Sequence, residues 1–167
     1  MSRPAVFFDR DGVLNEDLGY VYHQKQFKWM PGAMKTIKFL KDEGYSIFVI
    51  TNQSGVARGL YKEEDVQQLH LWMNEELFLR YRTQIDAFYY CPHHPSHGIG
   101  SYKRECQCRK PKPGLIHQAF HDFDIDISAS VVIGDKNSDM DAAKEVGITG
   151  WLFQGKNLYD FFVNKRS

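Results

Sequence analysis

Two carboxylates separated by a single residue follow the first apolar run of the chain. Asp9 and Asp11 come directly after the run Ala5–Phe8, and Gly12 follows them. If this run is a strand of an open α/β sheet, both side chains lie outside its carboxyl end, where such sheets bind ligands. One carboxylate can then attack a substrate while the other moves a proton. Acidic residues also form turns after strands, so the pair alone only suggests a catalytic site.

Three further polar segments carry residue types suited to phosphate chemistry. Residues 51–55 (Thr-Asn-Gln-Ser-Gly) offer hydroxyl, amide and backbone donors to an oxyanion. Arg109 and Lys110 precede an expected helix start, where cations and the helix N-terminus both favour phosphate. Asp135 and Asp139 supply the hard oxygen ligands that magnesium prefers. Each segment alone fits a turn, a linker or a helix cap, but their shared suitability for one reaction favours a catalytic site.

Short apolar runs alternate with helical patterns and must position these polar segments. The runs are mostly unbroken, which is typical of strands covered on both faces. The expected strands are Ala5–Phe8, Ser46–Ile50, Ile85–Tyr90, Val131–Ile133 and Thr149–Phe153. The expected helices are 33–43, 63–81, 114–123, 138–146 and 158–163. The alternation predicts an α/β fold, a Rossmann-like parallel sheet of about five strands with helices on both faces.

The length of 167 residues predicts a single domain, residues 1–167, with room for a full core. No stretch between the strands is long enough for a large separate cap, so we expect an open site. The only long aperiodic segment covers about residues 91–113. Loops of this length are usually functional or otherwise tied down, which indicates an insertion with its own stabilising feature.

All three cysteines lie in this insertion, together with nearby histidines. An odd number of clustered cysteines fits a metal site better than a disulfide framework. Three thiolates and one imidazole form a set that binds structural zinc, and a metal would stabilise a loop without its own core. The candidate zinc ligands are Cys91, His93, Cys106 and Cys108. His94 or His97 could take the place of the histidine, and three free thiols remain the alternative.

The charge balance of the chain argues against other classes of function. The 21 basic and 21 acidic side chains cancel, so no basic field favours nucleic acid or an anionic membrane surface. No apolar run approaches the roughly 20 residues that span a bilayer, and the N-terminus lacks a signal pattern. We therefore expect a soluble, cytoplasmic monomer that acts on a small molecule, without a nucleic-acid or membrane partner.

The four polar segments resemble the ordered motifs of the haloacid dehalogenase (HAD) superfamily of phosphohydrolases. The matching residues are Asp9, Asp11, Thr51, Lys110, Asp135 and Asp139. Longer strings at 19–21, 51–59, 89–95 and 106–111 are similar to the heptose bisphosphate phosphatase family within it. The resemblance covers nearly the whole chain. It implies a magnesium-dependent enzyme that removes the C7 phosphate of D-glycero-D-manno-heptose 1,7-bisphosphate through an aspartyl-phosphate.

The resemblance also implies roles for individual residues. Asp9 would be the nucleophile and Asp11 the general acid and base, while Thr51 and Lys110 would stabilise the transferring phosphoryl group. Magnesium would be held by Asp9, the Asp11 backbone carbonyl and Asp135, with Asp139 outside this ligand set. Among the histidines, the resemblance favours His93 as the zinc ligand. The implied substrate contacts are Asp17, Leu18, Gly19, Tyr20, Asn52, Gln53, Ser54, Arg58, Arg109 and Lys136.

Two other functions compete with this interpretation. A histidinol-phosphate phosphatase has the same chemistry and a similar zinc loop, but its loop between the ligand pairs is usually shorter. A zinc-stabilised binding module without catalysis is disfavoured by the intact catalytic residues and the zero net charge. Leu18 stands where relatives often carry histidine, and relatives typically continue further after Gly155. These departures leave the sugar and its preferred anomer open.

Overall fold

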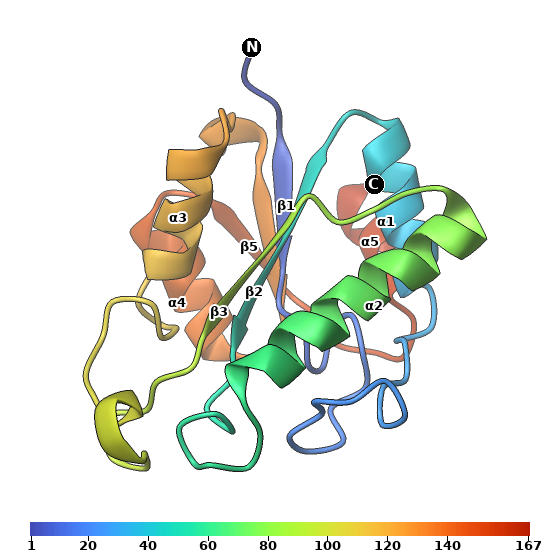
Figure 1. Cartoon of the computed structure of the whole chain (residues 1–167). Coiled ribbons are helices and arrows are strands. Elements are labelled where there is room, and N and C mark those ends of the chain that lie inside the picture. The colour runs from blue at the N-terminus through green and yellow to red at the C-terminus, as the bar shows by residue number, and fades with distance from the viewer.

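The computed structural model describes residues 1–167, and a five-stranded parallel sheet runs through its centre (Figure 1). The strand order across the sheet is β3-β2-β1-β4-β5. The strands are β1 (Ala5–Phe8), β2 (Ser46–Asn52), β3 (Ala87–Cys91), β4 (Val131–Gly134) and β5 (Thr149–Leu152). The predicted α/β fold with a Rossmann-like parallel sheet is confirmed.

Helices cover both faces of the sheet (Figure 1). They are α1 (Ala33–Asp42), α2 (Glu63–Tyr81), α3 (Gly114–Asp122), α4 (Asn137–Glu145) and α5 (Leu158–Arg166). Alternate residues of a strand point to opposite faces, so Val6 and Phe8 of β1 share a core with α1, α2 and α5. Ala5 and Phe7 pack with α3 and α4 on the other face. Burial on both faces explains why this strand is entirely apolar.

The ends of the strands depend on partners that lie far away in the sequence. β2 continues through two polar residues because Thr51 pairs with Tyr90, and Asn52 with Cys91, in the ladder to β3. β3 starts two residues after the expected Ile85, whose backbone N–H and C=O are both bonded by the Asn74 side chain instead. Each predicted strand and helix is present, and the differences lie at the ends.

The insertion between β3 and α3 contains one short 3-10 helix, η1 (Gly100–Tyr102). Polar contacts at its start and along its length join the insertion to the rest of the molecule. Glu63 of α2 accepts hydrogen bonds from the hydroxyls of Tyr90 and Tyr102, both at 2.7 Å. The Ile99 N–H donates to the carbonyl of Ala57 at 2.8 Å.

A second 3-10 helix, η2 (Ile127–Ala129), precedes β4. None of the helices combines the length and apolar character that a membrane crossing requires.

Candidate active site

The carboxyl ends of three neighbouring strands bring the predicted catalytic segments to one edge of the sheet. β1 lies between β2 and β4, and the strand order reverses between β1 and β4. Asp9 directly follows β1, Asp135 directly follows β4, and Thr51 lies near the end of β2. Open α/β sheets bind ligands at such a reversal point. The topology therefore places two carboxylates and a hydroxyl at the position expected of an active site.

Lys110 lies in the centre of this edge and joins two of its carboxylates. Its Nζ donates to Asp9 Oδ1 at 2.9 Å, to Asp139 Oδ1 at 2.6 Å and to the Ile50 carbonyl at 2.9 Å. Burial lowers the pKa of Lys110, but Asp9 and Asp139 more than offset this effect, so its pKa is raised. The lysine is therefore a buried cation with all three of its donors used.

Asp9 is buried, with 7% of its surface exposed. The pKa of Asp9 is raised to about 8, chiefly by burial, with Lys110 opposing the shift and Asp139 and Asp135 adding to it. The backbone N–H of Arg10 also donates to Asp9 Oδ1 at 2.9 Å. A further cation beside Asp9 would favour the ionised form, which is the form that can attack an electrophile.

Three carboxylates at this edge form a potential cation site. Oxygen atoms of Asp9, Asp135 and Asp139 lie within 4.8 Å of one another. Asp135 Oδ1 is buried without a hydrogen-bond partner. Gly12 has a φ of +91°, and a Cβ at this position would come within 2.1 Å of Asp135 Oδ2. An unpaired carboxylate oxygen beside further carboxylates, with glycine leaving room for it, fits a hard divalent cation such as magnesium.

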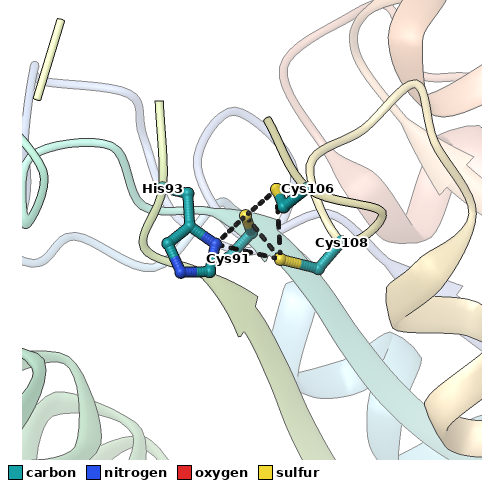
Figure 2. Close-up of side chains that lie close together, drawn as sticks. All are labelled: Cys91, His93, Cys106 and Cys108. Atoms are coloured by element: carbon teal, nitrogen blue, oxygen red, sulfur yellow. Dashed lines mark hydrogen bonds between the residues drawn. The ribbon is translucent and has the colours of Figure 1, made fainter. Parts of the chain in front are cut away.

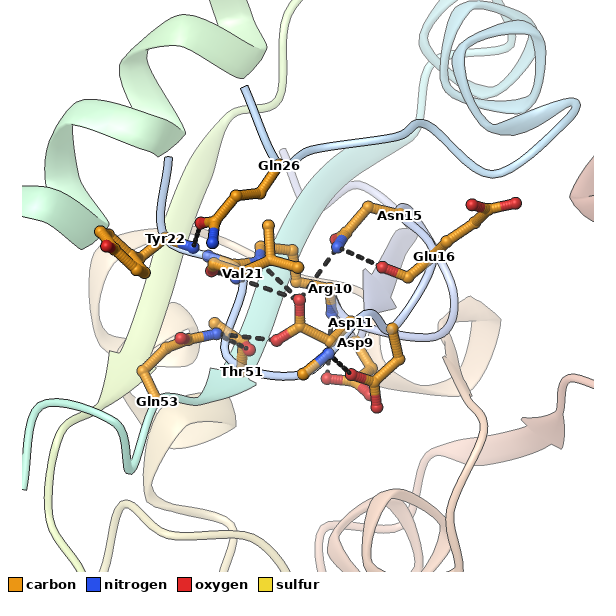
Figure 3. A network of polar contacts seen from close by, with 12 residues as sticks. Asp9, Arg10, Asp11, Asn15, Glu16, Val21, Tyr22, Gln26, Thr51 and Gln53 are labelled. Carbon is orange, nitrogen blue, oxygen red and sulfur yellow. Dashed lines mark hydrogen bonds and ion pairs between the residues drawn. The ribbon is translucent and has the colours of Figure 1, made fainter. Parts of the chain in front are cut away.

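Asp11 is held by donors on both of its carboxylate oxygens (Figure 3). Oδ1 accepts from Arg10 Nη2 and from Asn15 Nδ2, both at 3.0 Å. Oδ2 accepts from Gln53 Nε2 at 3.1 Å. Arg10 is fully buried and also donates to the Val21 carbonyl at 2.6 Å. Sequence reasoning missed Arg10 and Asn15, although a cation between two acids after an apolar strand is a usable signal.

The polar residues at the end of β2 form hydrogen bonds with the Lys110 backbone and with one another. The Asn52 side chain donates to the Lys110 carbonyl at 3.2 Å and accepts from its backbone N–H at 3.0 Å. This amide therefore holds the backbone that carries the lysine. Thr51 Oγ1 accepts from Gln53 Nε2 at 2.9 Å and donates to the Asn52 carbonyl at 3.5 Å, a long contact that an oxygen of a bound phosphate can replace.

The other predicted substrate residues lie outside this hydrogen-bonded centre. Asp17, Leu18, Gly19 and Tyr20 form an exposed turn, in which Gly19 (φ 80°) and Tyr20 (φ 49°) are left-handed. Ser54 and Arg109 are half-buried, while Arg58 and Lys136 are exposed. Burial lowers the pKa of His94, and the positive charges of Arg109 and Arg58 lower it further. The structure gives none of these residues a hydrogen bond to Asp9.

The four predicted zinc ligands converge in the insertion (Figure 2). Their ligand atoms all lie within 4.8 Å of one another. His93 Nδ1 lies 3.7 Å from Cys91 Sγ and 3.6 Å from Cys108 Sγ. The pKa of the Cys108 thiol is lowered to about 5, chiefly by its hydrogen bond with Cys91. His94 Nδ1 instead accepts backbone N–H groups within its own turn. Three sulfurs and one imidazole in this arrangement are compatible with a closed zinc site.

Comparisons with known proteins find phosphatases that match most of the chain. The family model described as HAD-hydrolase-like matches residues 107–156. A D-glycero-beta-D-manno-heptose-1,7-bisphosphate 7-phosphatase of Rhodopseudomonas palustris is 45% identical over 98% of this chain and 89% of its own length. A phosphatase of the same name from Vibrio cholerae is 47% identical over 89% of this chain and 79% of its own length.

The crystal structure of one similar phosphatase contains magnesium and phosphate. It is the D,D-heptose 1,7-bisphosphate phosphatase of B. bronchiseptica complexed with magnesium and phosphate. It is 30% identical, with a TM-score of 0.80, and the match covers 97% of this chain and 86% of that one. Together with the buried cluster of acids and lysine at the sheet edge, these similarities show that the chain belongs to the heptose-1,7-bisphosphate 7-phosphatases, a family of phosphoric monoester hydrolases within the HAD-like hydrolases.

Proposed function

We propose that this chain removes the 7-phosphate of D-glycero-D-manno-heptose 1,7-bisphosphate and leaves heptose 1-phosphate for nucleotide-activated heptose synthesis. The names of the relatives support the sugar. The observation that carries the chemistry is the contact of Asp9 with Lys110 at 2.9 Å beside the unpaired oxygen of Asp135. It combines a nucleophile, a fixed cation and a free metal-binding oxygen, which phosphoryl transfer requires.

The first half of the reaction forms a bond between Asp9 and phosphorus. The Asp9 carboxylate attacks the C7 phosphate, and the bond from phosphorus to the sugar oxygen breaks. Lys110 and the Thr51 hydroxyl stabilise negative charge on the transferring oxygens. The oxygens of Asp9 and Asp135 and the backbone carbonyl of Asp11 would hold magnesium, which when bound supplies positive charge against the repulsion between carboxylate and phosphate.

Asp11 carries the protons in both halves of the reaction. It protonates the departing sugar alkoxide as Asp9 becomes phosphorylated. It then accepts a proton from the water that attacks the phosphorylated Asp9, so its protonation state returns to the start. Both roles need a fixed carboxylate beside Asp9, and the donors from Arg10, Asn15 and Gln53 support this position.

The substrate is tested by steady-state hydrolysis of both anomers of heptose 1,7-bisphosphate and of histidinol phosphate, each with and without magnesium. We expect kcat/KM for one heptose anomer to exceed that for histidinol phosphate by at least about 10²-fold, because only the bisphosphate carries a second phosphate for the proposed contacts Arg58 and Arg109. Phosphorus NMR should show one released phosphate and a retained 1-phosphate. A preference for histidinol phosphate would establish the alternative, and turnover of neither would favour a binding module.

The zinc site is the second part of the proposal, and it predicts about one zinc per purified chain. Cys106→Ser is expected to reduce the zinc content at least tenfold and to lower the melting temperature, because the insertion has no core of its own. Elemental analysis and thermal unfolding measure both effects. His97→Gln is the matched control, since His97 is exposed outside the cluster and should leave both values unchanged. A stable wild-type protein without metal would contradict the assignment.

We also propose that residues 1–167 act as one phosphatase domain, with the zinc loop at about 91–113 as an insertion. The two largest core clusters pack on opposite faces of the same sheet, which supports this proposal. A monomeric state, a cytoplasmic location and the lack of nucleic-acid and membrane partners remain predictions from the sequence.

A further inference from the structure

The buried Gln53 side chain links Asp11 and Thr51 of the proposed active site. Only 2% of Gln53 is exposed. Its Nε2 donates to Asp11 Oδ2 at 3.1 Å and to Thr51 Oγ1 at 2.9 Å (Figure 3). One amide group therefore contacts both the carboxylate that moves protons and the hydroxyl that stabilises the phosphoryl group. The position of this amide affects both.

The other end of the Gln53 amide is held by Tyr61, which lies in the loop before α2. The Tyr61 hydroxyl donates to Gln53 Oε1 at 2.6 Å. The ring of Tyr61 is 7% exposed and stacks on Tyr22, with centroids 5.0 Å apart and planes at 10°. Gly55 leaves room for it, because a Cβ there would come within 2.1 Å of the ring. Packing thus fixes the hydroxyl independently of the amide.

The present orientation of the amide satisfies all of these partners. Asp11 Oδ2 and Thr51 Oγ1 both accept from the NH₂ end of Gln53, and the carbonyl end has no proton to donate to either of them. Burial raises the pKa of Tyr61 to about 12, so its hydroxyl keeps the proton that it donates to the carbonyl end. Without this hydroxyl, Oε1 would be a buried acceptor without a partner, which favours rotation of the amide away from its present position.

We propose that Tyr61 is a positioning residue for Asp11 and that it acts through the orientation of the Gln53 amide. The inference rests on the proposed function, in which Asp11 protonates the leaving alkoxide. Tyr61 itself contacts neither Asp11 nor Asp9 in the hydrogen-bond network. Loss of its hydroxyl should therefore impair proton transfer to the leaving group while the nucleophile stays in place.

Tyr61→Phe tests this proposal because it removes the hydroxyl and keeps the stacked ring. The value of kcat/KM covers only the steps up to phosphorylation of Asp9, and a sugar alkoxide needs a proton in that step. Nitrophenolate leaves without one. We expect kcat/KM to fall about tenfold for heptose 1,7-bisphosphate and by no more than about twofold for p-nitrophenyl phosphate. Equal losses for both substrates would overturn the proposal.

Two further variants separate positioning from general destabilisation. Tyr89→Phe also removes the hydroxyl of a buried tyrosine, but this hydroxyl donates to Asp122 on α3, and the ratio of the two rates should not change. In a Gln53→Leu background, Tyr61→Phe should cause no additional loss, because the group that it orients is missing. An additional selective loss in that background would show that Tyr61 acts by another route.

The test also distinguishes this inference from the substrate assignment. If the wild-type enzyme does not hydrolyse the heptose bisphosphate, the proposed function fails in the wild type, before any variant is compared. An unbranched alkyl phosphate then replaces the sugar as the substrate with a poor leaving group. With that substrate, the inference fails if the ratio of alkyl to aryl rates is the same in Tyr61→Phe and in the wild type.

Discussion

Asp9→Asn is expected to lower phosphate release by on the order of 10⁴-fold or more while the protein remains folded. The amide keeps the shape of the side chain but cannot serve as a nucleophile toward phosphorus. Burial of a neutral amide costs less than burial of a carboxylate, and Lys110 keeps its contacts with Asp139 and Ile50. Phosphate release at saturating magnesium and the melting temperature measure the two expectations.

The matched control for this variant is Asp124→Asn. Asp124 is an exposed acid, with 70% of its side chain accessible, and its only ion pair is with the N-terminal amine at 3.7 Å. Its replacement should leave phosphate release unchanged. A loss in the control as large as in Asp9→Asn would mean that the assay responds to general damage.

The stereochemistry at phosphorus tests the covalent step itself. Transfer to Asp9 and then to water involves two in-line displacements, so a substrate with a chiral, oxygen-isotope-labelled thiophosphate group should release inorganic thiophosphate with net retention. Direct attack by water would give inversion. Acid-quenched wild-type enzyme should also carry labelled phosphate that is absent from Asp9→Asn. Net inversion would remove Asp9 from the role of nucleophile.

The sequence predicts the elements of this fold because each element has a local signature. The apolar runs reflect burial of the strands on both faces, and the apolar stripe of α2 is buried at Val66, Leu69, Met73 and Leu77. The ends of the strands are not local properties. β2 continues to Asn52 because Cys91 is opposite to pair with it, and Ile85 is excluded from β3 because Asn74 binds its backbone.

In the candidate site, too, some features have a local signature in the sequence and others depend on distant residues. The placement of Asp9 and Asp135 at one edge could be predicted, because each directly follows a strand, and Lys110 could be selected from its charge and its place before a helix start. The contacts of the supporting residues could not be predicted in this way. Arg10 lies between two acids, which is a signal in the sequence, but its contacts with His70 of α2 and with the Val21 carbonyl depend on distant segments. Tyr61 gains its role from the side chain of Gln53, which no periodic pattern places beside it.

Lys110→Met is expected to reduce kcat by about 10² to 10³-fold, because it removes the positive charge that stabilises the transferring phosphoryl group in the proposed mechanism. Its effect on KM should be smaller, since the proposed substrate contacts at Arg58 and Arg109 are unchanged. Lys112→Met is the matched control two residues away. Lys112 is 41% exposed, forms one ion pair with Glu105 at 3.3 Å, and should be replaceable at almost no cost in turnover.

The same variant should also reduce stability, because Lys110 pairs with two buried carboxylates. Removal of one partner from a buried ion pair typically costs about 3–5 kcal/mol of unfolding free energy, which denaturant titration can measure. The loss of turnover must therefore be measured where circular dichroism shows the variant to be folded. Under that condition, a kcat near the wild-type value would remove Lys110 from the reaction and leave it only the structural role of joining Asp9 to Asp139. A loss of kcat in the folded variant, with Lys112→Met unaffected, requires the Lys110 charge in the transition state.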